Sequence, residues 1–138
     1  MTANGYSVAA LAYLGDCVLE LTTRAYLVKQ GISDAGTLNE KALSFVKAGA
    51  QSAAMDRLEG VLTEEEAAWF RRGRNHSNTA VPKSASPRDY RRATGMEALF
   101  AYLDLSGQQA RAEELFGIAY SDVMAELENR NNKENHHD

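Results

Sequence analysis

Leu11-Ala12-Tyr13-Leu14-Gly15-Asp16-Cys17-Val18-Leu19 is an apolar stretch that carries a single charge, the carboxylate of Asp16. A carboxylate in apolar surroundings loses hydration, and a partner or a cation must compensate for that loss. A second stretch of this kind lies far along the chain, where Glu97 is the only charge between Ala93 and Leu103. Two isolated acids in two apolar helical stretches indicate a metal site assembled from two helices.

The helix around Asp16 is expected to run from about Ser7 to Gln30, with Gly31 ending it. Spacings of three and four residues place its core stripe on Leu11, Leu14, Val18, Leu21, Ala25 and Val28. Leu19 and Leu27 lie outside this stripe, so the helix is apolar on more than one side. Such a helix is either central in the core or shared between the core and a partner chain.

The remaining segments also carry helix signals, and none is typical of a strand. Thr63 and Glu66 form a capping-box pattern, and Pro87 after Ser86 suits the start of another helix. Further helices are expected over residues 37–51, 63–72, 87–105 and 109–128. The first of these either continues through residues 48–58 or is followed there by a separate helix. We therefore predict an all-α fold, with one domain over residues 1–128 and a disordered polar tail over residues 129–138.

The composition fits one soluble globular domain of 138 residues. No segment approaches the roughly 20 apolar residues that a membrane span needs. The N-terminal residues lack the basic and apolar segments of a secretory signal. Cys17 is the only cysteine and has no internal disulfide partner, so we expect a cytoplasmic protein that acts away from the membrane.

The net charge of −4 conceals one concentrated basic segment, residues 71–92. This segment holds seven lysines and arginines against Asp89 alone, a net charge of +6, which leaves −10 for the rest of the chain. A local positive field can attract a polyanion even when the whole protein is acidic. Residues 73–87 form a long expected loop, which suggests a functional role. A solvated face without a ligand remains the alternative.

The charges on the first helix fall on one line, because Asp16, Glu20 and Arg24 are spaced by four residues. Glu20 and Arg24 are oriented favourably for a helical ion pair, which leaves Asp16 without a cation of its own. Carboxylate oxygens suit Mg²⁺, which keeps several waters and takes few protein ligands. The alternative for Asp16 is a hydrogen bond to a neighbouring helix, and the alternative for Glu97 is a buried salt bridge to an arginine.

A glycine lies close to each acid in the sequence, Gly15 before Asp16 and Gly95 before Glu97. Gly95 lowers helix stability by roughly 1 kcal/mol relative to alanine, and a small residue there would allow the first helix to approach at Gly15. Acids for a metal ion beside a basic loop for phosphate describe a phosphodiester hydrolase.

Three groups of residues together resemble the ribonuclease III catalytic domain. The segment from Tyr13 to Glu20 resembles its first signature, and Thr94-Gly95-Met96-Glu97-Ala98-Leu99 with Tyr102-Leu103 resembles its second acidic signature. The segments from Phe70 to Asn75 and from Val81 to Lys83 look like the basic loop of Mini-ribonuclease III. This bacterial subfamily has the catalytic domain without a double-stranded-RNA-binding domain. The resemblance covers about residues 6–127.

The resemblance implies a helical bundle of the ribonuclease III endonuclease type and a homodimer with one site in each subunit. It implies that Asp16 and Glu97 are catalytic and bind Mg²⁺, with Mn²⁺ as the alternative ion. The family pattern has further acids where this chain has Ala12 and Thr94. The implied activity is cleavage of double-stranded RNA in the maturation of large-subunit (23S) ribosomal RNA precursor, with a ribosomal protein as a possible assistant.

Without a separate binding domain, the catalytic domain must itself bind the duplex. We assign the basic segment to phosphate contact, with these candidate RNA-binding residues: Arg71, Arg72, Arg74, Asn75 and Lys83. Glu20 either influences the metal by contacting its ligands without binding the ion, or only pairs with Arg24. Two other functions stay open: a non-catalytic RNA-binding protein on the same fold, and a phosphohydrolase for small phosphate substrates.

Overall fold

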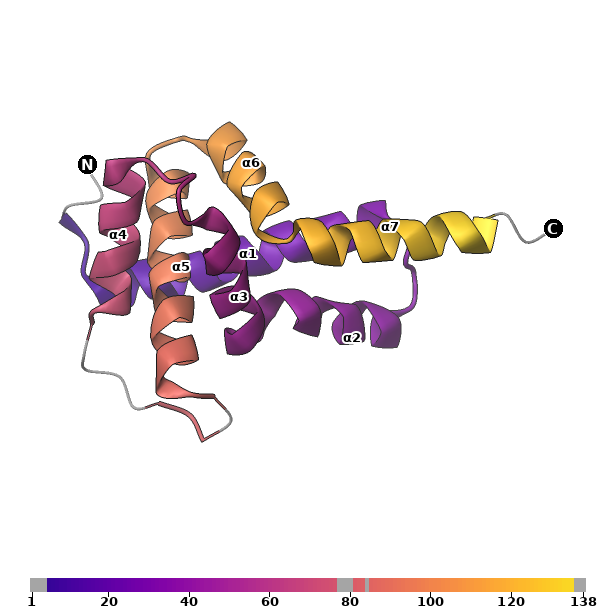
Figure 1. Ribbon diagram of the computed structural model, residues 1–138, viewed down its shortest axis with the longest axis horizontal. Helices are drawn as coiled ribbons and strands as arrows, with labels where there is room; N and C mark the ends of the chain where they lie inside the picture. The colour runs from indigo at the N-terminus through magenta and orange to yellow at the C-terminus, as the bar shows by residue number, and fades with distance from the viewer. Residues whose placement is uncertain (1–4, 77–80, 84, 136–138) are drawn as a thin grey trace.

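The structure is a computed structural model that describes residues 5–76, 81–83 and 85–135 (Figure 1). Its helices are α1 (Val8–Lys29), α2 (Ala35–Val46), α3 (Ala48–Leu58), α4 (Glu64–Arg74), α5 (Pro87–Leu105), α6 (Gln109–Ala119) and α7 (Ser121–Asn135). The described residues contain no strand, which confirms the all-α prediction. None of the described helices combines the length and the apolar character that crossing a bilayer requires.

Helix α5 is the centre of the bundle, and it packs against α1, α3, α4 and α6. Its residues from Ala98 to Leu103 are all buried, so this helix is covered on every side. It begins as expected: Pro87 is in the first turn, and the Ser86 side chain accepts a hydrogen bond from the backbone N–H of Asp89. Helix α4 lies alongside α5, and α1 crosses both (Figure 1).

The buried face of helix α1 agrees with the expected stripe only in the first half of the helix. Its buried residues recur every fourth position, on Leu11, Gly15, Leu19, Thr23 and Leu27. Leu21 and Val28, predicted in the core stripe, are 69% and 60% exposed. The first half of the predicted stripe is confirmed, because Leu11 is buried and Leu14 and Val18 pack against the core, whereas its second half faces outward. The physical reason is close packing, because glycine allows α5 to approach where leucine would hold it away.

Two helix boundaries also differ from the predictions. Lys47 adopts an extended conformation, with ψ at 146°, and separates α2 from α3. The expected last helix is two helices, α6 and α7, which meet at Tyr120. The Tyr120 hydroxyl donates to the Phe45 carbonyl oxygen at 2.7 Å and so fixes this corner to the core. Helix α7 continues to Asn135, so residues 129–135 are helical and the predicted disordered tail is wrong there, while residues 136–138 lie outside the described range.

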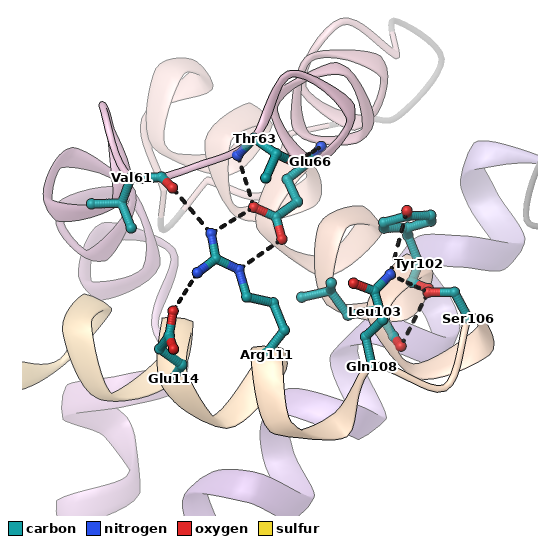
Figure 2. Close-up of polar contacts among 9 residues, drawn as sticks. All are labelled: Val61, Thr63, Glu66, Tyr102, Leu103, Ser106, Gln108, Arg111 and Glu114. Atoms are coloured by element: carbon teal, nitrogen blue, oxygen red, sulfur yellow. Dashed lines mark hydrogen bonds and ion pairs between the residues drawn. The ribbon is translucent and has the colours of Figure 1, made fainter.

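A buried ion pair fixes α4 to α6 (Figure 2). Glu66 is 3% exposed, and its two carboxylate oxygens each accept a hydrogen bond from the Arg111 guanidinium at 2.9 Å. Glu66 also accepts from the Thr63 backbone N–H, while Thr63 accepts from the backbone of Glu66, so the expected capping box is present. Arg111 further donates to the Val61 carbonyl oxygen and to Glu114. This network sets the start of the helix whose other end carries the basic segment.

Candidate active site

Asp16 and Glu97 come together because α1 and α5 touch at the level of the backbone. Gly15 is buried, and a Cβ atom built there would lie 1.8 Å from the carbonyl oxygen of Glu97 and 2.7 Å from its Cα. No side chain can occupy that space, so only glycine permits this crossing. Asp16, the next residue on α1, is thereby held close to Glu97 on α5.

The Glu97 carboxyl lies in an environment that favours its neutral form. Burial raises its pKa, and the negative charge of Asp16 and a hydrogen bond between the two carboxyl groups raise it further, to about 8. Asp16 is exposed, whereas Glu97 is half-buried. Among the described residues neither acid forms an ion pair with a lysine or arginine. The alternative of a salt bridge from Glu97 to an arginine therefore finds no support in this part of the chain.

Two adjacent carboxylates without a cation are a suitable donor set for a divalent ion. Mg²⁺ prefers such oxygens and keeps several waters, so it needs few protein ligands. No group of three or more histidine, cysteine, aspartate or glutamate side chains is placed to hold a metal within the described ranges. The Thr94 hydroxyl donates to the Tyr90 carbonyl oxygen at 3.1 Å. An ion at this site would therefore have Asp16 and Glu97 as its protein ligands and water or a phosphate oxygen at its other positions.

Glu20 lies one turn after Asp16 and forms the predicted ion pair with Arg24. The Arg24 Nη2 and Nε atoms lie 2.9 Å and 3.2 Å from Glu20 Oε1. Glu20 is only half-exposed, while Arg24 is open to solvent. The pair leaves Asp16 as the uncompensated acid of this helix face.

Gly95 has a different neighbour from the expected one. A Cβ at Gly95 would lie 2.6 Å from ring atoms of Phe70, which belongs to α4 and not to α1. Gly73 of α4 faces the same place, where a Cβ would lie 2.8 Å from the Gly95 Cα and 2.9 Å from the Thr94 carbonyl oxygen. The two glycines bring the end of α4 against α5 within a turn of Glu97, so Gly95 places the basic segment near the acids.

The basic segment presents its cations from ordered supports at the end of α4. The Arg72 guanidinium lies 4.9 Å from the centre of the Trp69 ring, and Arg74 lies 5.6 Å from that of Phe70. Arg74 also donates to the side chain of Asn75 at 3.2 Å. Ring contact orients a guanidinium and leaves N–H donors free for an anion. Exposed cations at Arg71 and Lys83 complete this set.

Part of the basic segment is structural, which corrects the assignment of the whole of it to phosphate contact. Arg92 is buried, and it donates to the Ser52 hydroxyl and carbonyl oxygens and to Asp56 at distances of 2.5–2.9 Å. Arg88 also lies close to Asp56, at 4.0 Å. A pocket of about 320 Å³ between α4 and α5 is lined by Arg74, Asn75, Arg88, Arg91 and Arg92. Arg92 thus ties α5 to α3 and contributes little free charge.

A larger cavity, of about 950 Å³, opens beside Glu97 between the α2–α3 junction and α5. Lys47, Gln51, Tyr90 and Thr94 are among its lining residues. Lys47 and Gln51 were not predicted as site residues from the sequence. A lysine and a glutamine near an alanine-rich helix give no signal that separates them from ordinary surface residues. The only available signal was indirect: the uncertain boundary between the two helices falls at Lys47.

Known proteins share the sequence pattern and the fold of this chain. The family model of the Ribonuclease III domain matches residues 9–108. A Mini-ribonuclease 3 of Symbiobacterium thermophilum is 43% identical over 109 residues, covering 79% of this chain and 84% of the relative. A Mini-ribonuclease 3 of Clostridium tetani is 39% identical over 127 residues, covering 91% and 83%. The crystal structure of a Fusobacterium nucleatum protein is similar with a TM-score of 0.75 at 28% identity, covering 84% of this chain and 93% of that one.

Proposed function

Because this chain belongs to the ribonuclease III domain family, whose members are endoribonucleases, we propose that it is a Mg²⁺-dependent enzyme that hydrolyses phosphodiester bonds in double-stranded RNA. The observation that carries the proposal is the pair of Asp16 and Glu97, two carboxylates without a cation at the crossing of α1 and α5. The family uses a divalent metal ion and acts on double-stranded RNA. Basic side chains at the end of α4 supply the complementary phosphate contacts.

In the proposed mechanism, Asp16 and Glu97 are the residues that would hold the metal, either Mg²⁺ or Mn²⁺. When bound there, such an ion would supply a lowered pKa for a water ligand and stabilisation of the charge on the leaving oxygen. Glu97 must release its proton to become a ligand, because its pKa is about 8 in the metal-free protein. Gly15 fixes the separation of the two acids by keeping the helix backbones in contact. Arg24 neutralises Glu20, so that the negative charge of this helix face concentrates at Asp16.

The duplex is held by the candidate RNA-binding residues Arg71, Arg72, Arg74, Asn75 and Lys83. Support for Arg71, Arg72, Arg74 and Asn75 comes from their position at the end of α4, which Gly73 and Gly95 hold against α5 near Glu97, and support for Lys83 comes from its exposure. Phosphate contacts of this kind position a nucleic acid without reading its sequence. We therefore expect the acids and the cations to contact the same RNA strand. The scissile phosphate would lie at the acids, and flanking phosphates would lie at the cations.

The enzyme is proposed to act as a homodimer in the cytoplasm. The outer face of α1 supports the dimer, because it exposes Tyr13, Leu21 and Val28, at 85%, 69% and 60%, in one helix. An exposed apolar face of this kind marks an interaction surface. The single cysteine, Cys17, is free, which suits a reducing compartment. The proposed cellular role is maturation of large-subunit (23S) ribosomal RNA precursor, with a ribosomal protein as a candidate assistant.

The direct test incubates purified protein with duplex RNA, single-stranded RNA and duplex DNA, each with Mg²⁺ or with EDTA. We expect cleavage of duplex RNA only, and only with Mg²⁺. Asp16→Asn should bind the duplex and fail to cut it, while Glu113→Gln, at an exposed acid on α6, should behave as the parent. Retained binding without cleavage by the parent would favour the non-catalytic alternative, which the absence of acids at Ala12 and Thr94 keeps open.

A further inference from the structure

Gln51 is a buried polar side chain without a partner beside the candidate active site. It lies in the first turn of α3 and is 4% exposed. Its backbone N–H donates to the Lys47 carbonyl oxygen, but its side-chain amide makes no hydrogen bond to any described residue. No fully buried side-chain nitrogen or oxygen in the described ranges lacks a partner, so the amide of Gln51 must reach the cavity that it lines.

This state differs from that of the buried charged side chains. Glu66 and Arg92 are buried to a similar extent, and both are bound by specific partners. Burying an amide without a partner is unfavourable, and such groups in native proteins call for a specific reason. A ligand that fills the cavity would satisfy the amide. The volume of about 950 Å³ falls in the range typical of ligand pockets.

The surroundings of Gln51 indicate which chemical group it would meet. Glu97 and Thr94 line the same cavity, so whatever occupies it lies next to the phosphate that the acids would act on. Lys47 lines it too, is exposed, and forms no ion pair with a described residue, so an anionic backbone is favoured there. An amide both donates and accepts hydrogen bonds. A ribose 2′-hydroxyl also does both, whereas a phosphate oxygen only accepts.

We propose that the Gln51 amide binds the 2′-hydroxyl of a ribose adjacent to the scissile phosphate and thereby selects RNA over DNA. This inference rests on the proposed function, since it assigns a specificity residue to the same site. Duplex RNA displays its 2′-hydroxyls in a wide, shallow groove while its bases stay paired, so the sugar is the group that a cavity at the backbone can reach. DNA would leave the amide unsatisfied.

The test combines a side-chain change with an atom change in the substrate. Duplex RNAs carry a single 2′-deoxy nucleotide at each position around the cleavage site, and kcat/KM is measured for each. For the parent we expect a loss of roughly three- to tenfold at one position, the loss typical of one hydrogen bond. Gln51→Met, similar in size and without polar donors, should show that loss on the all-ribose duplex and no further loss with the deoxy nucleotide. Gln109→Met, at an exposed glutamine on α6, is the matched control and should keep the parent pattern.

The outcomes separate this inference from the function on which it rests. A parent that does not cut the all-ribose duplex overturns the proposed function. A parent that cuts it, with no deoxy position near the scissile bond affecting kcat/KM, overturns the role of Gln51 without any variant. The same holds if Gln51→Met keeps the full sensitivity of the parent to the deoxy nucleotide. If each single 2′-deoxy nucleotide lowered kcat/KM of the parent by the same factor, no single ribose would be recognised, and this result would also contradict the proposal.

Discussion

At the scale of single residues, the site depends on one half-buried acid. Glu97 has its pKa raised to about 8, because it loses hydration and faces Asp16. A metal ion would reverse this situation, since it favours the charged form of both carboxylates. Asp16 and Glu97 could be identified from the sequence because a lone charge in an apolar helical run is costly without a partner. Gln51 could not, because an uncharged side chain leaves no such contrast.

Replacing Glu97 with glutamine should stabilise the metal-free protein at high pH. The folded-state pKa of about 8 lies above the ordinary value of 4.5, so Glu97 favours folding at low pH and loses this contribution as pH rises through 8. This loss begins above the ordinary value of 4.5 and is complete above 8, so Glu97→Gln should match the parent near pH 4 and exceed it at pH 9 by more than about 1.4 kcal/mol, the worth of one pKa unit. Urea denaturation in EDTA at both pH values measures this difference. Equal differences at the two pH values, or an identical effect in Glu113→Gln, would contradict the pKa shift.

At the scale of helices, the sequence predicted the elements better than their faces. The capping box at Thr63 and the Ser86–Pro87 start were confirmed, because capping is local chemistry. The inner face of α1 was predicted only in part, because it includes Gly15 and Thr23, which hydropathy ranks below the exposed Leu21. Backbone contact with α5 decides that face, and a long-range contact leaves no trace in the local pattern.

Helix α4 should contribute salt-dependent binding through its C-terminal arginines. Arg72→Gln keeps much of the side-chain stem on Trp69 and removes the charge. We expect weaker duplex binding and a slope of log K against log salt that is shallower by about one. The control is Arg130→Gln, because Arg130 pairs with Glu126 on the surface of α7. An unchanged slope in Arg72→Gln would remove this residue from the phosphate contacts.

The other end of α4 should depend on the ion pair shown in Figure 2. Glu66 is only 3% exposed, and Arg111→Leu would remove the cation that pairs with its carboxylate. Breaking one side of a buried pair typically costs about 3–5 kcal/mol, whereas a surface pair is worth at most about 1 kcal/mol. Denaturant unfolding of Arg111→Leu beside Arg130→Leu measures this contrast. Similar losses in the two variants would show that the pair does not anchor α4.

At the scale of the whole molecule, the apolar outer face of α1 is the feature that the single chain leaves unpartnered. Its exposed side chains follow one another along the helix, from Tyr13 through Leu21 to Val28. The apolar residues outside the expected stripe, Leu19 and Leu27, left two positions open for this helix, central in the core or shared with a partner chain, and both residues are buried in the core of the same chain. The central position of α5 was not predicted, although its nearly continuous apolar residues indicated burial on several sides.

A charge on this outer face should abolish the proposed dimer. Leu21→Glu places a carboxylate at the middle of the face, where a partner would desolvate it, while the folded monomer tolerates it because the position is 69% exposed. Sedimentation equilibrium should show a dimer for the parent and a monomer for Leu21→Glu. Leu105→Glu, at a less exposed leucine ending α5, should remain dimeric. A parent monomer, or a dimeric Leu21→Glu, would contradict an interface through α1.

The central claim is that Asp16 and Glu97 jointly hold the metal that cuts duplex RNA, and single-turnover cleavage by Glu97→Gln tests it most directly. This variant keeps the size of the side chain and the helix crossing at Gly15, and it removes only the carboxylate. With Mg²⁺ and saturating enzyme, we predict a cleavage rate reduced by about a thousandfold or more, with duplex affinity within about threefold of the parent. Cleavage by Glu97→Gln at the parent rate would contradict the two-helix metal site.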